Sequence, residues 1–145
     1  MNAAARTFRW VSALALSSML AWTQVAAQVP AKRGAEDPNH PCGAIYTDHY
    51  GPFDYRTQRH ELKIVEDFHF TAKVEALQAG QSGWIGGDLN YTLRASPNHH
   101  RALYALVRWT ERKRSDTTEG QSLPVECYFD RAIRFRPDDT IVRAM

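Results

Sequence analysis

Histidine and cysteine are the side chains of this sequence best suited to bind a metal ion or to transfer a proton. The six histidines are His40, His49, His60, His69, His99 and His100. A zinc site needs histidines at i and i+4 on a helix with a glutamate nearby, or cysteines at short spacing. Neither pattern occurs, and the adjacent His99 and His100 would point to different faces of a helix. The sequence therefore predicts no metal site.

Motifs of the common enzyme classes are also missing from the sequence. There is no Gly-x-Ser-x-Gly elbow, no phosphate-binding glycine loop and no dinucleotide fingerprint. Asp48 and His49 would form an acid–base pair, whereas Gly86-Gly87-Asp88 is more simply the start of a helix. We therefore expect a non-enzymatic protein with no catalytic residue and no cofactor. Metal-dependent or other hydrolysis in the region rich in histidine and aromatic residues is the alternative.

The two cysteines, Cys42 and Cys127, are far apart in the chain. A disulfide between them would tie an irregular N-terminal arm to the last helix and stabilise the fold by about 2–4 kcal/mol if it is unstrained. Two separate buried thiols are the other interpretation. Spacing alone does not show whether the sulfur atoms meet.

A polar stripe is the main candidate for partner binding. It consists of Arg101, Tyr104, Arg108, Glu111 and Arg112. Four of these, without Glu111, fall at i, i+3, i+7 and i+11, which is the spacing of one helix face. Arginine pairs with carboxylates through two parallel hydrogen bonds, so this face would suit an acidic partner. A solvated face with no partner is the alternative.

The stripe needs a helix to carry it, and the clearest helical pattern in the chain runs from about Pro97 to Lys113. Its apolar face is formed by Leu103, Leu106, Val107 and Thr110. Proline is well tolerated in the first turn, and the preceding Ser96 is a candidate N-cap.

Shorter helices are expected on both sides of this element. They are Thr57–Phe68 with Thr57 as cap, a short helix from Ala72 that stops at Gly80, Leu89–Ala95 with Asp88 as cap after a glycine-rich loop, and Pro124–Arg136. The last one would turn Val125, Phe129, Ala132 and Ile133 toward the core. Residues 115–124 are rich in Thr, Ser and Gly and are predicted to form a loop.

The segment Cys42–Tyr55 is rich in Tyr, Phe, Gly and Pro, and it has no helical or alternating period. We predict an aromatic loop with a turn at Gly51-Pro52. Its apolar residues would cap one end of the helical stack, although contact with a ligand is the alternative. They are Ile45, Tyr46, Phe53 and Tyr55.

The first residues have the pattern of a secretory signal. Arg6 and Arg9 precede a short apolar run, which is followed by Val25-Ala26-Ala27. The apolar run is shorter than the roughly 20 residues of a membrane-spanning helix. We therefore predict cleavage near Ala27, a periplasmic or secreted protein with no membrane span in the mature chain, and a flexible tether over residues 28–41.

The charge of the mature chain argues against nucleic acid as a partner. Residues 1–27 hold two of the 18 basic residues and none of the 16 acidic ones, so the remainder is neutral apart from histidine. Nucleic-acid binding depends mainly on neutralising phosphates with basic residues, and a neutral chain gives no general case for it.

Two similar stretches indicate an internal repeat. Asp88–Tyr104 and Tyr128–Ala144 each run through a short amphipathic segment into a proline, then Asn or Asp, and then a second helical pattern. On these residues the chain resembles tetratricopeptide repeat proteins, whose unit of 34 residues is a pair of antiparallel helices. The positions that agree are Ala102, Leu103, Tyr104 and Leu106 for a first helix, and Phe129, Ala132 and Ile133 for a second.

The chain also departs from that family. Pro97 and Pro137 are 40 residues apart, Val107 stands where a small glycine is usual, and Thr92 replaces an alanine. The resemblance covers Ile85–Met145 and contains one complete unit. More loosely, residues 42–84 resemble exported bacterial proteins that end in such repeats.

The resemblance implies a mainly α fold, with a short array of antiparallel helix pairs over residues 85–145 and an irregular, aromatic-rich region over residues 42–84. It also implies that the polar stripe lines a concave groove that binds a protein or peptide. The array would be cut at the C-terminus, because residues 138–145 look like the opening of another helix. A structural fragment of a longer repeat protein is therefore a third possibility.

Overall fold

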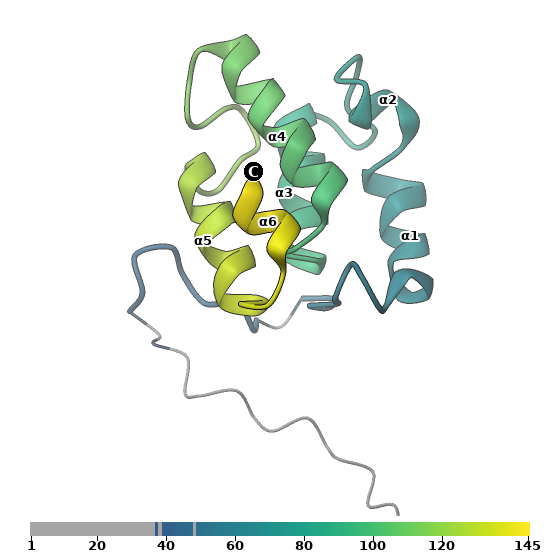
Figure 1. Ribbon diagram of the computed structural model, residues 1–145. Helices are drawn as coiled ribbons and strands as arrows, with labels where there is room; N and C mark the ends of the chain where they lie inside the picture. Colours follow the sequence, from purple (N-terminus) through teal and green to yellow (C-terminus); the bar gives the residue numbers. More distant parts are fainter. Residues whose placement is uncertain (1–36, 38, 48) are drawn as a thin grey trace, which may run out of the picture. The chain divides into compact units, whose positions relative to one another are not determined.

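The computed structural model describes residues 37, 39–47 and 49–145 (Figure 1). In these residues all regular structure is helical and there is no strand. The helices are α1 (Arg59–His69), α2 (Ala72–Glu75), α3 (Ile85–Ala95), α4 (His100–Lys113), α5 (Val125–Phe135) and α6 (Thr140–Ala144). The prediction of a mainly helical protein is confirmed. The predicted signal peptide, most of the tether and Asp48 lie outside the described residues.

The core lies along α3 and α4, which pack against each other. α1 packs on α3, α5 on α4, and α6 on α5. Four leucines at helical spacing are completely buried, and each contributes about 1.5–3 kcal/mol on burial. They are Leu89, Leu93, Leu103 and Leu106. Thr110 is buried as predicted, whereas Val107 is only half-buried. None of the described helices is long and apolar enough to cross a bilayer.

The two prolines of the similar stretches lie in connections of the same backbone geometry. α3 and α5 both have 11 residues, and the connections that follow them make the same hydrogen bonds. Ser96 N donates to Thr92 O and Arg136 N donates to Ala132 O, both at 2.9 Å. His99 N donates to Ser96 O and Asp139 N donates to Arg136 O, both at 3.0 Å. The connections after α3 and after α5 therefore have the same turn geometry.

The predicted start of α4 is wrong. The helix begins at His100, not at Pro97, and its N-cap is His99 rather than Ser96. Nδ1 of His99 accepts a hydrogen bond from Ala102 N at 3.1 Å. Pro97 and Asn98 stay in the turn because the Asn98 side chain bonds with Asp54 and Asp139 and with Tyr55 N instead.

The predicted cap of α3 is also wrong. The helix begins at Ile85, so Asp88 lies inside it. The Asp88 carboxylate accepts hydrogen bonds from Gln81 N at 2.6 Å and Ser82 N at 3.2 Å. These bonds fold the glycine-rich loop back over the first turn of the helix.

The first helix is displaced by one residue from its predicted bounds, and the second is shorter than expected. α1 begins at Arg59 after Gln58, and Thr57 does not cap it. The Gln58 side chain accepts a hydrogen bond from Asp54 N instead. α2 ends at Glu75, well before Gly80, because Leu77 takes a left-handed backbone conformation with φ of 56°.

The aromatic loop packs against α5. Cys42 and Cys127 form a disulfide, which answers the question that the sequence left open. Arg134 donates to Gly43 O at 3.0 Å, and Arg131 donates to Ala44 O. Ile45 and Tyr55 are buried, as expected for residues that cover the helices, and the ring of Tyr46 lies against that of Phe135.

Candidate functional site

A cleft of about 290 Å³ lies beside α1 and α3. It is lined by Tyr50, Ile64, Val65, Phe68, His69 and Tyr91. Four of these side chains are large, apolar and exposed: Tyr50 at 47%, Ile64 at 56%, Phe68 at 62% and Tyr91 at 42%. Scattered single apolar residues are normal on a protein surface, whereas a group of them around one cleft is typical of an interaction site.

α1 has apolar residues on both of its faces, which explains the cleft. Leu62 and Val65 are buried, and α1 packs on α3. Ile64 and Phe68 are one helical turn apart and point outward. Packing of α1 against the core accounts for the first pair and leaves the second pair exposed.

Tyr50 connects this cleft with two neighbouring hollows of about 170 and 530 Å³. Its hydroxyl donates to Glu61 O at 3.0 Å, and its ring lies 4.8 Å from that of Phe53, so the side chain is held in place. The polar residues that line the two hollows are His49, His60, Glu61, Lys63, Asp67, Asn90 and Arg94. The apolar cleft therefore has a rim of mixed charge.

His69 forms the polar part of the cleft wall. Its Nδ1 lies 3.0 Å from Oδ1 of Asp88, and its ring stacks on Tyr91 with the centroids 3.8 Å apart. Burial alone would raise the pKa of Asp88, but hydrogen bonds from Ser82, His69 and two backbone N–H groups outweigh it and lower the pKa. Asp88 is thus a carboxylate, and it favours the His69 tautomer with a proton on Nδ1. In the neutral imidazole with that tautomer, Nε2 is a hydrogen-bond acceptor.

The arrangement of Ser82, His69 and Asp88 differs from that of a hydrolase triad. A catalytic serine bonds to one histidine nitrogen while the aspartate bonds to the other. Here the Ser82 hydroxyl donates to Asp88 and lies 3.5 Å from the same Nδ1 atom. The group therefore fixes the orientation of His69 and does not activate Ser82.

Two residues of the predicted polar stripe hold α2 and the residues after it against α4. Arg101 makes two hydrogen bonds to the carboxylate of Glu75, one of them at 2.8 Å, and Arg112 donates to Leu77 O at 2.8 Å. The hydrogen bond from Arg101 lowers the pKa of Glu75. Arg101 and Arg112 were predicted to bind a partner. In the structure they bind groups of the protein itself.

The other residues of the stripe stay at the surface of α4. Tyr104 is 59% exposed, and the guanidinium of Arg108 lies 5.6 Å from the centre of its ring. Glu111 is exposed one turn further on. Tyr104, Arg108 and Glu111 remain available to contact a partner.

The adjacent histidines face different parts of the protein, as expected. His99 is completely buried: its Nε2 lies 3.0 Å from Oε1 of Glu66, and its Nδ1 caps α4. Burial lowers the pKa of His99 more than Glu66 raises it, which keeps the imidazole neutral. His100 Nε2 lies 2.8 Å from Asp139. These contacts join structural elements.

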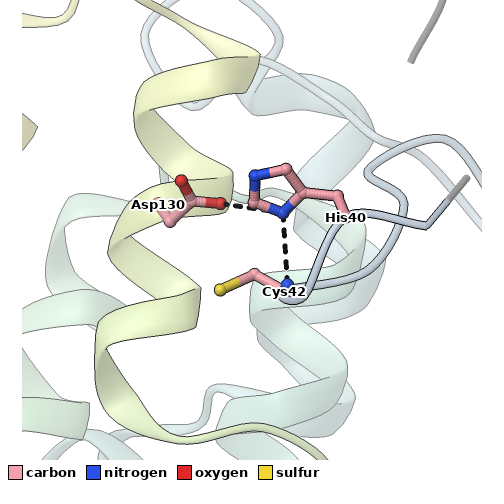
Figure 2. Close-up of side chains that lie close together, drawn as sticks. All are labelled: His40, Cys42 and Asp130. Carbon is pink, nitrogen blue, oxygen red and sulfur yellow. Dashed lines mark hydrogen bonds and ion pairs between the residues drawn. The ribbon is translucent and has the colours of Figure 1, made fainter. Parts of the chain in front are cut away.

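A second group of potential ligands lies where the aromatic loop meets α5 (Figure 2). His40 Nδ1 accepts a hydrogen bond from Cys42 N at 3.1 Å and lies 3.7 Å from Oδ2 of Asp130. This group is not evident from the sequence, because His40 and Asp130 are far apart in the chain. In the disulfide state Cys42 offers no thiolate to a metal.

Comparison of the chain with known protein families, with curated proteins and with solved structures finds no match in any of the three.

Proposed function

We propose that this protein is an exported, non-enzymatic helical scaffold of the tetratricopeptide type that binds a peptide segment of a partner protein. The observation that carries the proposal is the group of four exposed apolar side chains around one cleft. The same turn geometry after α3 and after α5 supports the repeat assignment, and the disulfide supports an oxidising compartment.

The cleft suits a peptide with an apolar or aromatic anchor residue. Such a side chain would lie against Phe68 and Tyr91, where burial of both surfaces supplies the affinity. His69 Nε2 would accept a hydrogen bond from a peptide N–H. The mixed charges on the rim, such as Lys63 and Asp67, would set the direction of the peptide.

The polar face of α4 is a second contact in this proposal. Tyr104 and Arg108 would receive an acidic part of the same partner, since arginine pairs with carboxylates. Hydrolysis has less support, because Ser82 lies on the wrong side of His69 for proton transfer.

Affinity measurements on displayed peptides test the proposal. Peptides selected on the purified protein would be titrated by fluorescence anisotropy against three variants. Ile64→Ser/Phe68→Ser should weaken binding at least about tenfold, and Arg108→Glu should weaken acidic peptides selectively. Ile141→Ser, which changes an exposed apolar residue of α6 outside the cleft, is the matched control. Unchanged affinity in Ile64→Ser/Phe68→Ser would exclude the cleft, and unchanged affinity in the arginine variant would exclude the α4 face.

A further inference from the structure

Four potential metal ligands converge on the disulfide that joins the aromatic loop to α5. His40 and Cys42 come from the loop, and Cys127 and Asp130 lie one turn apart on the same side of α5. The donor atoms of His40, Cys42 and Asp130 all lie within 4.8 Å of one another (Figure 2). Sγ of Cys127 is bonded to Sγ of Cys42, so it belongs to the same group.

Reduction converts this group into a complete ligand set. A dithiol reductant transfers two electrons and two protons to the Cys42–Cys127 bond and itself becomes a disulfide. The sulfur–sulfur bond breaks, and Cys42 and Cys127 each carry a thiol. Loss of a proton from each thiol, on metal binding, gives two thiolates.

We propose that the reduced chain binds one Zn²⁺ through the thiolates of Cys42 and Cys127, Nδ1 of His40 and the carboxylate of Asp130. Zinc prefers four such ligands at the corners of a tetrahedron, which places donor atoms about 3.3–3.8 Å apart. His40 Nδ1 and Asp130 Oδ2 are already 3.7 Å apart. The hydrogen bond from Cys42 N to His40 Nδ1 is exchanged for the bond to zinc.

Two arginines keep the ligands together when the disulfide is absent. Arg131 donates to Ala44 O and Arg134 donates to Gly43 O, so the loop stays attached to α5. Arg134 also donates from Nε to Asp130 Oδ2 at 2.7 Å, which orients the carboxylate. Three anionic ligands and Zn²⁺ leave one negative charge, and the Arg134 guanidinium beside Asp130 offsets it.

Zinc and the disulfide are mutually exclusive in this arrangement, because both use the same sulfur atoms. Zinc stabilises the dithiol state by mass action, and oxidation releases the ion. The aromatic loop is then linked to α5 by zinc under reducing conditions and by the Cys42–Cys127 disulfide under oxidising conditions.

Zinc titration of the full chain tests the proposal. The protein would be reduced with dithiothreitol without oxygen, desalted and titrated with Zn²⁺ against a chromophoric chelator. We expect one zinc ion per reduced chain and none per oxidised chain. Co²⁺ should give a thiolate charge-transfer band and the strong visible bands of four-coordination. His40→Ala and Asp130→Asn should each weaken zinc binding at least tenfold, and His60→Ala, at an exposed position of α1, should leave it unchanged.

Two results would overturn the proposal. One is a reduced chain that binds no zinc. The other is equal affinity in wild type, His40→Ala and Asp130→Asn, because two thiolates alone would then account for binding. If reduction lowers the helix content measured by circular dichroism, zinc must restore it in the wild type and not in the two variants. Failure to do so also contradicts the site.

Discussion

The connection Ser96–His99 before α4 and the connection Arg136–Asp139 before α6 make the same backbone hydrogen bonds and end in different caps. His99 is a neutral cap that accepts one N–H bond. Asp139 is a charged cap that accepts bonds from Ile141 N at 3.2 Å and Val142 N at 3.4 Å. The same turn is therefore compatible with a neutral and with a charged N-cap residue. His99 also contacts Glu66, and Asp139 also contacts His100.

Asn98 joins the two connections to each other and to the aromatic loop. Its Oδ1 accepts from Tyr55 N at 3.0 Å, and its Nδ2 donates to Asp54 and Asp139, both at 2.9 Å. The equivalent residue in the second connection, Asp138, points outward, and its side chain is 72% exposed. Equal backbones therefore do not imply equal roles for the side chains.

The largest effect is expected for Asn98→Ala. The change removes three buried hydrogen bonds and leaves Tyr55 N and two carboxylates without that partner, so unfolding should need about 3 kcal/mol less free energy. Urea denaturation measures it. Asp138→Ala, at the equivalent exposed position, is the matched control and should change the free energy by less than about 1 kcal/mol. Equal losses would show that the two positions are equivalent after all.

Asp139→Ala should have the next largest effect. It removes the α6 cap and a buried acceptor for Asn98 and His100, with an expected loss of about 2 kcal/mol. Asp139→Asn keeps a capping oxygen and should lose less. Thermal unfolding of both variants compares them, and an equal loss would mean that the charge on Asp139, not the cap, stabilises the connection.

The two caps should fail in different pH ranges. Burial lowers the pKa of His99 below its ordinary 6.5, so the unfolded chain takes up the proton first. The contribution of neutral His99 to the free energy of unfolding is full above pH 6.5 and decreases as pH falls toward the pKa of His99 in the folded protein. Burial would raise the pKa of Asp139, but hydrogen bonds from His100 and Asn98 lower it below 3.8. Its contribution is present above pH 3.8 and is lost as pH falls through the folded pKa.

Unfolding free energies measured from pH 8 to 3 test this separation. His99→Asn keeps a capping side chain and removes the titrating group. The variant should show a shallower loss of stability as pH falls below 6.5, and an unchanged loss below pH 3.8. If the variant loses stability just below pH 6.5 as steeply as the wild type, groups other than His99 cause that loss.

The sequence predicted the parts of the fold that depend on local pattern. The two alike connections follow from Pro97 and Pro137, and the burial of Leu103 and Leu106 follows from helical spacing. The caps could not be predicted, because His99 replaces Ser96 only when Asn98 turns inward to reach Tyr55 N, 43 residues away in the chain. Tertiary contacts of this kind override local preference.

The apolar cleft escaped prediction for a related reason. Ile64 and Phe68 are as apolar as Leu62 and Val65, and the sequence of α1 does not say which pair meets α3. The excess of apolar residues on α1 was the available signal. For the polar stripe, the helical spacing was predicted correctly, but two of its residues bind within the protein. Arg101 bonds to Glu75 and Arg112 bonds to Leu77 O, in a segment that the sequence predicted only as a short helix.

The smallest expected effect has the opposite sign. Ser96 and Arg136 occupy equivalent positions, but the Ser96 hydroxyl is buried without a hydrogen-bond partner in the described part of the chain, whereas Arg136 donates to Asp54. A buried hydroxyl without a partner costs desolvation energy, so Ser96→Ala should leave stability unchanged or raise it by up to about 1 kcal/mol. Arg136→Ala should lower it. Urea denaturation of both variants measures the pair, and a loss above 1 kcal/mol in Ser96→Ala would mean that the hydroxyl has a partner after all.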